Sequence, residues 1–235
     1  MTHEQAMWVH ILLGSVGLLT FWGALLSRKG SERHKRWGRP FFISLLAVAL
    51  SVGPLLFLQA GPFNPARVVQ FTYLSLCLAT VTMLAWTAIR WREQPARFRG
   101  LHFKVLGPLL LALGAVVLAA GLASGDPVPT VLSWVGLFHG ALMVRFAWLR
   151  APLLPNWWLN WHITCVCSLF TAVHGTFAFT FYRWAMAPEA SREVSAAMHL
   201  LVLGVAVGLR LWFGARRGVP LRFTQRVAST QVASA

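Results

Sequence analysis

Apolar runs of about 20 residues recur along the whole chain, and they constrain its fold more than any other feature. A hydrocarbon core about 30 Å thick is crossed by roughly 20 apolar residues in a helix. Runs of this length, separated by basic or Pro/Gly-rich breaks, span residues 7–27, 40–60, 68–89, 105–124, 130–149, 157–182 and 195–213. The sequence therefore predicts an all-α, polytopic bundle of seven transmembrane helices.

The composition agrees with a chain that lies in lipid. Of the 235 residues, 57% are hydrophobic and 11% are charged, whereas soluble domains carry about 25% charged residues. Because the apolar runs are joined by short polar connections, we expect one membrane domain over residues 1–213. Residues 214–235 are basic at first and then rich in Ser, Thr, Val and Ala, so we expect a disordered cytoplasmic tail.

The net charge of +15 raises the question of nucleic-acid binding, since basic patches bind phosphate backbones. The placement of the charges argues against it. All but three of the 21 Lys and Arg residues fall within 28–39, 90–104, 145–150 and 210–226; the exceptions are Arg67, Arg183 and Arg192. This positive-inside pattern predicts an outer N-terminus and a cytoplasmic C-terminus. We expect the basic loops to meet anionic lipid headgroups, and no nucleic acid.

Histidines inside the apolar runs form two pairs at matched depths. With a rise of about 1.5 Å per residue, His10 and His199 lie roughly 5–6 Å from the outer boundary, and His139 and His174 roughly 12–14 Å below it. His174 also shares a helix face with a polar stripe, since the spacing alternates between four and three residues. The stripe consists of Asn160, Thr164, Cys167, Thr171 and His174.

Ionisable residues inside a membrane are rare enough to be functional-site hypotheses. Axial histidines from two neighbouring helices bind haem iron, and imidazole also suits copper or zinc. We therefore predict His139 with His174 as the first cofactor-binding pair and His10 with His199 as the second, with haem b as the candidate cofactor and a membrane redox partner. The competing interpretation is that each histidine hydrogen-bonds a Ser, Thr or carbonyl group within the bundle.

All six acidic residues lie outside the apolar runs, which weakens proton-coupled transport and carboxylate-based catalysis in the membrane. No Walker loop, GxSxG elbow, HExxH or dinucleotide fingerprint occurs. We assign no catalytic residue. Two other functions stay open: a small-solute transporter or channel lined by polar stripes, and an accessory subunit or homo-oligomer that packs through Gly136xxxGly140 and Gly204xxxGly208.

Two longer motifs resemble a known family. The first is HILLGSVGLLTFWGALL from His10 onwards, followed by RKGSERHKRWGRPFF; the second is RFAWLRAP, followed by NWWLNWHITCVCSLFTAVHGTF. They resemble bacterial multi-pass membrane proteins catalogued as domain of unknown function 2306, over most of residues 8–182. The positions that match are Lys29, Gly30, His34, Gly38, Arg39, Trp158, His162, Thr171 and Ala172. The resemblance implies a helical protein of the bacterial inner membrane and names no reaction, so His34 and His162 receive no defined role.

Overall fold

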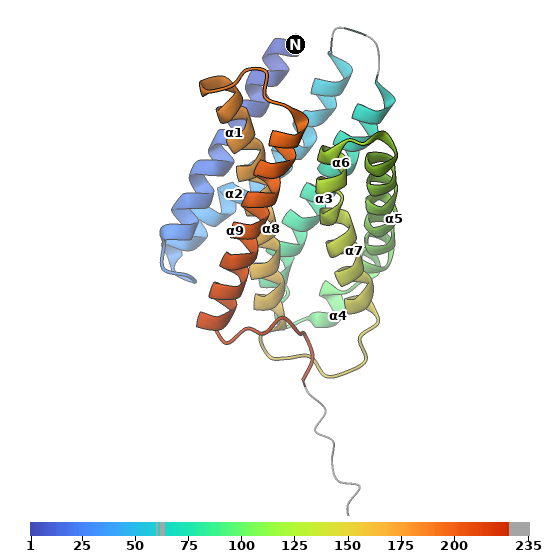
Figure 1. Ribbon diagram of the computed structural model, residues 1–235. Helices are drawn as coiled ribbons and strands as arrows, with labels where there is room; N and C mark the ends of the chain where they lie inside the picture. Colours follow the sequence, from blue (N-terminus) through green and yellow to red (C-terminus); the bar gives the residue numbers. More distant parts are fainter. Residues whose placement is uncertain (60, 62–63, 226–235) are drawn as a thin grey trace, which may run out of the picture.

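The computed structural model describes residues 1–59, 61 and 64–225 as a helical bundle (Figure 1). Seven helices are long and apolar enough to cross a membrane, which confirms the predicted fold. The spans are α1 (His3–Leu26), α2 (Glu32–Phe57), α3 (Pro65–Arg90), α5 (Leu101–Ser124), α6 with α7 (Pro127–Leu132, Trp134–Ala147), α8 (Trp157–Ala185) and α9 (Arg192–Arg216). A short helix, α4 (Pro95–Phe98), lies in the loop before α5.

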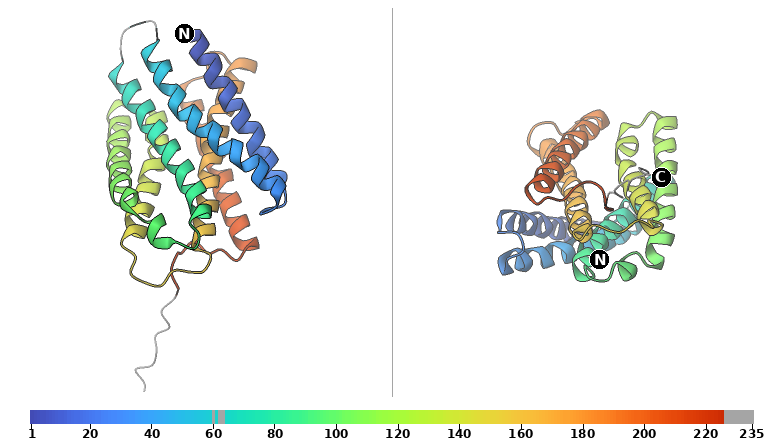
Figure 2. Two further views of the ribbon diagram at one scale, coloured as in Figure 1. Left: turned by 180° about the vertical axis from the view of Figure 1, so that it is seen from behind. Right: turned by 90° about the horizontal axis from the view of Figure 1, so that it is seen from below.

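The helices pack mainly in sequential pairs around two central helices. The closest pairs are α1 with α2, α5 with α7 and α8 with α9, while α3 packs against both α2 and α8. Viewed along the bundle, α1 and α2 lie opposite α5–α7, with α3 and α8 between them (Figure 2). The face of α1 that carries Gly17 packs on α2, since a Cβ on Gly17 would lie 3.1 Å from Oγ of Ser44.

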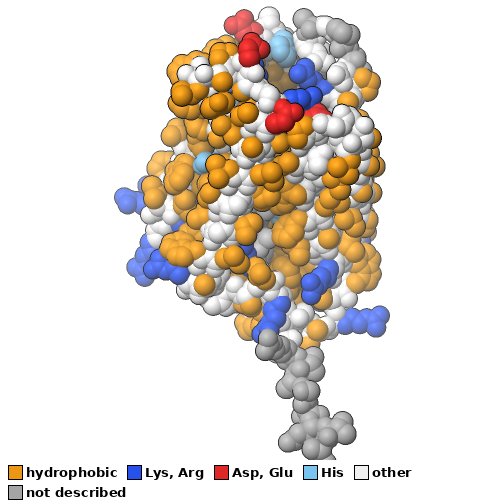
Figure 3. Space-filling view, viewed as in Figure 1, with side chains coloured by type: hydrophobic (Ala, Val, Ile, Leu, Met, Phe, Trp, Pro, Cys, Tyr) orange, Lys and Arg blue, Asp and Glu red, His pale blue; other side chains and the backbone are white. Residues whose placement is uncertain are grey.

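Charges separate between the two ends of the bundle. We call the end formed by residues 27–31, 91–100, 148–156 and 217–225 the basic end. Hydrophobic side chains cover the middle of the face in Figure 3, and Lys and Arg gather at its lower end. By the positive-inside rule, the basic end is the expected cytoplasmic side.

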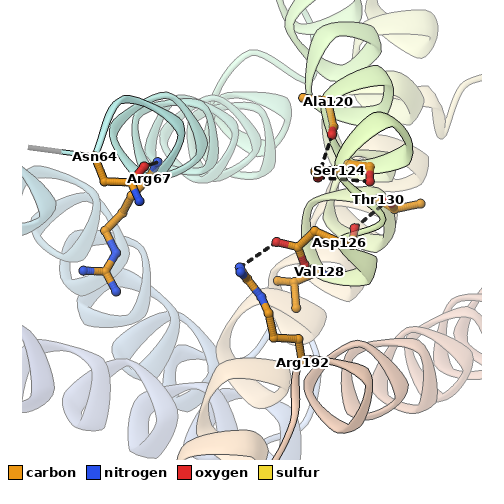
Figure 4. Close-up of polar contacts among 9 residues, drawn as sticks. Asn64, Arg67, Ala120, Ser124, Asp126, Val128, Thr130 and Arg192 are labelled. Atoms are coloured by element: carbon orange, nitrogen blue, oxygen red, sulfur yellow. Dashed lines mark hydrogen bonds and ion pairs between the residues drawn. The ribbon is translucent and has the colours of Figure 1, made fainter.

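The opposite end carries an ion pair between two helix beginnings. Asp126 caps α6 by accepting from the N–H of Val128 at 3.1 Å, and its other oxygen lies 2.7 Å from Nη2 of Arg192 at the start of α9. Arg67, at the start of α3, lies apart from this pair (Figure 4). The ion pair therefore links α6 to α9 at the outer end.

The fifth membrane span is broken at Ser133, between α6 and α7. Tyr73 of α3 supports the break: its hydroxyl donates to the carbonyl oxygen of Ser133 at 2.8 Å and accepts from the N–H of Gly136 at 2.9 Å. By contrast, α2 and α5 continue through Pro54 and Pro108 without interruption.

The two predicted glycine motifs have different surroundings. Gly136 and Gly140 pack against the backbone of α5, where a Cβ on Gly140 would lie 2.6 Å from the amide nitrogen of Leu111. Gly204 and Gly208 of α9 are exposed, and a Cβ on either would meet nothing within 4 Å. Among the described residues, the first motif packs against another helix and the second does not.

Residues 214–225 differ from the expected disordered tail. Helix α9 continues to Arg216, and residues 217–225, which we call the strap, fold back over the basic end. Val219 and Phe223 are buried, and Phe223 stacks on Trp161 at 5.2 Å between ring centroids. Aromatic packing at this end therefore holds a segment that lacks a regular apolar face. Residues 226–235 of the predicted tail lie outside the described residues.

Candidate functional site

The outer pair of predicted histidines makes local contacts with different helices. His10 of α1 is hydrogen-bonded through Nδ1 to Oγ of Ser51 on α2, at 2.7 Å. His199 of α9 donates from Nδ1 to the carbonyl oxygen of Ser195, at 2.8 Å, and lies against Gly175 of α8. The structure places these two histidines in separate surroundings.

The inner pair also points to different neighbours. His139 of α7 is fully buried, and its Nε2 is hydrogen-bonded to Oγ of Ser168 on α8 at 2.9 Å. His174 of α8 instead packs against Phe21 and Trp22 of α1, at 5.3 and 5.6 Å between ring centroids. Ser168 and His174 lie about 120° apart around α8. The structure therefore does not bring His139 and His174 together.

Each inner histidine nevertheless keeps one ring nitrogen without a partner. His174 donates from Nδ1 to the carbonyl oxygen of Phe170 at 3.0 Å, and its buried Nε2 has no hydrogen-bond partner among the described residues. Nδ1 of His139 is likewise buried and unpartnered in the described part of the chain. No group of three or more His, Cys, Asp or Glu side chains that could hold a metal occurs among the residues described.

The turn between α1 and α2 is built by residues on which the family resemblance rests. Gly30 has a φ of +83°, a left-handed conformation that favours glycine. Lys29 donates from Nζ to the carbonyl oxygens of Leu25 and Ala24, and His34 donates from Nδ1 to the same Ala24 oxygen at 2.9 Å. The last carbonyls of a helix lack partners within it, so Lys29 and His34 complete the end of α1.

His162 approaches this turn from α8. Its Nδ1 donates to the carbonyl oxygen of Ala85 on α3 at 3.0 Å, and its ring lies 6.3 Å from that of Phe42 on α2. The resemblance therefore marks residues on separate helices, His34 on α2 and His162 on α8.

Arg217, directly after α9, adds a further positive charge near Lys29 and His34. Burial and the charge of Arg217 lower the pKa of Lys29. We call this group the basic-end cluster; it consists of Lys29, His34 and Arg217.

The acidic residues of the basic end belong to other pairs. Glu32 lies 2.6 Å from Nζ of Lys35, and Glu93 lies 3.2 Å from Nε of Arg92; both carboxylates are exposed. Like charges that lie close together disfavour one another unless an opposite charge compensates. Lys29 and Arg217 carry the positive charge of the basic-end cluster, so these two side chains suit an anion better than a metal cation.

Arg210 of α9 is the residue that the sequence analysis missed. It is 7% exposed, and it binds two members of the polar stripe on α8. Its Nε donates to Oγ1 of Thr164 at 2.8 Å and its Nη2 to Oδ1 of Asn160 at 2.6 Å. An arginine within the apolar run 195–213 was the available signal, but it was grouped with the basic residues of the following tail.

Comparison of the chain with family models, curated proteins and solved structures finds no match. The resemblance to the bacterial family and the inner-membrane location stay predictions.

Proposed function

We propose that this integral membrane protein binds an anionic molecule at its basic end, through the basic-end cluster. Lys29 caps the end of α1 and lies over the ring of Phe213 near the end of α9, where Arg217 follows, so two positive charges from separate segments lie at one end of the bundle and support this function. The lowered pKa of Lys29 reflects a positive charge that burial and Arg217 disfavour. A bound anion would relieve that cost, because an opposite charge favours the charged form.

The basic loops suggest two sources for the anion. One is a soluble cytoplasmic solute, and the other is an anionic lipid headgroup, which the run from Arg28 to Arg39 is expected to attract. Both would be recognised through the same charges. A direct comparison of soluble anions with lipids separates them.

We expect Arg217→Gln to weaken anion binding about tenfold. A hydrogen bond to a charged group contributes about 1.5–3 kcal/mol, and 1.4 kcal/mol corresponds to a factor of ten. Stabilisation by phosphate, sulfate or citrate is measured on the full chain in mild detergent with a dye that fluoresces on reacting with thiols. Such a dye reports unfolding, because Cys77, Cys165 and Cys167 are all buried.

Lys104→Gln removes an exposed charge from the start of α5, outside the cluster, and serves as the matched control. Binding should also weaken as the pH rises through the lowered pKa of Lys29, because the anion favours its protonated form. Lys29→Gln should remove that part of the pH dependence. Equal losses in Arg217→Gln and Lys104→Gln would exclude the cluster as the site.

We also propose a second function, in which His174 binds haem or another metal centre and the protein serves electron transfer. The buried, unpartnered Nε2 of His174 supports it, because a fixed Nδ1–H···O=C bond is the usual arrangement of a ligating histidine. Haem would supply one-electron redox chemistry. His139 contacts another face of α8, so a second axial ligand would have to come from elsewhere.

For this function, His174→Ala is expected to abolish the bound cofactor while membrane insertion stays intact. The measurement is a visible absorption spectrum, oxidised and dithionite-reduced, with metal analysis of the same detergent-purified sample. His102→Ala, which lies outside the predicted histidine pairs, is the control. A cofactor content that is unchanged in His174→Ala would remove this histidine as a ligand.

The transport and accessory-subunit hypotheses stay predictions. Asn160 and Thr164, which belong to the predicted polar stripe, are engaged in contacts between helices. The open face at Gly204 and Gly208 leaves α9 free for lipid, a partner helix or a second copy of the chain.

A further inference from the structure

We propose that a groove beside Arg210 binds the phosphate group of an anionic membrane lipid. The groove lies between the end of α9 and the strap and has a volume of about 390 Å³. Arg210, Gly214 and Val219 line it, with Leu211 and Leu221 among its other lining residues. No residue of the basic-end cluster lines the groove, although Arg217 lies in the sequence between two of its lining residues, Ala215 and Gly218.

The charge of Arg210 is not compensated by any described acidic side chain. Its acceptors are the neutral oxygens of Thr164, Asn160 and Pro220, at 2.8, 2.6 and 3.4 Å. It forms no ion pair with any described residue, and all six acidic residues of the chain are among those described. A buried charge is costly unless it is paired, so an external anion is the missing partner.

One side of the Arg210 guanidinium group is free of hydrogen bonds to the described residues. Nη1 makes no hydrogen bond to the described part of the chain, whereas Nε and Nη2 are both used. A Cβ on Gly214 would collide with Nη1 and lie 2.9 Å from the carbonyl oxygen of Val219. Glycine at this position therefore keeps open the space in which Nη1 lies.

The groove lies near the end of a membrane-spanning helix, where lipid headgroups are expected. Arg210 lies about 9 Å from the end of α9, and Trp212 and Arg216 next to it form a cation–π contact at 5.0 Å. Trp and Arg are typical of the headgroup level. Leu211 and Leu221 are 51% and 65% exposed, so the groove has an apolar rim.

These features together favour a lipid over a soluble ion. Guanidinium groups bind phosphate strongly through charge-assisted hydrogen bonds. The exposed leucines offer an apolar surface that the acyl chains of a lipid can contact. A free phosphate ion gains nothing from such a surface. The volume falls at the lower end of the range of about 300–1,000 Å³ seen for small-molecule sites, which suits one headgroup.

The test is binding of phosphatidylglycerol to the full chain after delipidation in mild detergent, read as bound lipids by native mass spectrometry and as thermal stabilisation with the thiol dye. The wild-type protein should retain one tightly bound lipid. Arg210→Gln should lower the affinity about tenfold or more, as expected for the loss of a charge-assisted hydrogen bond. Arg216→Gln, which removes an exposed neighbouring charge, should keep the lipid.

A second variant guards against misfolding of Arg210→Gln, which also loses contacts to α8. Leu221→Glu places a carboxylate at the exposed rim and leaves the bonds of Arg210 intact, so the variant should fold and lose the lipid. Equal retention of phosphatidylglycerol by wild type, Arg210→Gln and Leu221→Glu would overturn the proposal. Stabilisation by inorganic phosphate equal to that by the lipid would also overturn it, in favour of a soluble ligand.

Discussion

Replacing Gly140 by alanine is expected to lower the stability of the bundle by about 2 kcal/mol. The new Cβ would lie 2.6 Å from the amide nitrogen of Leu111 and 2.8 Å from the carbonyl oxygen of Gly107. Overpacking costs typically about 1–3 kcal/mol, and backbone atoms cannot rotate away as a flexible side chain does. Helix α7 must therefore separate from α5, even though alanine favours a helix by about 1 kcal/mol over glycine.

The measurement is thermal unfolding in mild detergent followed with the thiol dye. A loss of about 2 kcal/mol corresponds to a fall in Tm of about 4–8 °C for a chain of this size. Gly208→Ala is the matched control, since nothing lies within 4 Å of its added Cβ; it should leave Tm unchanged or raise it slightly. A similar fall in both variants would mean that helix propensity or lipid contacts, not the α5–α7 interface, govern the response.

The contrast between Gly140 and Gly208 shows what a sequence pattern leaves open. Both belong to a GxxxG motif on an apolar helix, and the motif alone predicts close packing for both. Hydropathy depends only on the residues of one segment, so the seven helices could be predicted. Which face of a helix meets a neighbour depends on how all the helices are arranged in the bundle. The open face at Gly208 could therefore not be predicted from the sequence.

The histidines illustrate the same limit. The depth of a residue along a helix follows from counting residues. Equal depth was the reason for predicting His139 and His174 as a pair. Direction around the bundle axis depends on how α7 and α8 are rotated, and the structure turns His139 towards Ser168 and His174 towards α1. Equal depth was therefore insufficient to predict a shared site.

Arg210 and the strap were missed because their contacts lie far apart in sequence. Arg210 was read with the basic residues that follow it, although Asn160 and Thr164 were already placed on one face of their helix. Phe223 is the only aromatic residue after Phe213, and the sequence does not show that Trp161 and Phe146 leave a place for it.

Replacing Phe223 by alanine is expected to release the strap from the basic end. Its ring lies 5.1 Å from that of Phe146 and 5.2 Å from that of Trp161, and the residue is 6% exposed. Loss of a buried phenylalanine costs about 3–5 kcal/mol. Because each 1.4 kcal/mol is a factor of ten, the open form of the strap should become about a hundredfold more populated or more.

Limited proteolysis with trypsin measures this opening, because cleavage follows the population of the open form when opening and closing are fast. In Phe223→Ala, cleavage after Arg217 and Arg222 should accelerate strongly, with products identified by mass. Leu221→Ala, which truncates a side chain that is 65% exposed, should behave like wild type. The strap is also held by Asn160, which donates to the carbonyl oxygens of Pro220 and Arg222 at 2.8 and 3.0 Å. If Phe223→Ala is cleaved no faster than wild type, these hydrogen bonds rather than aromatic packing hold the strap. The strap would then keep its place as one wall of the groove beside Arg210 even without the Phe223 ring.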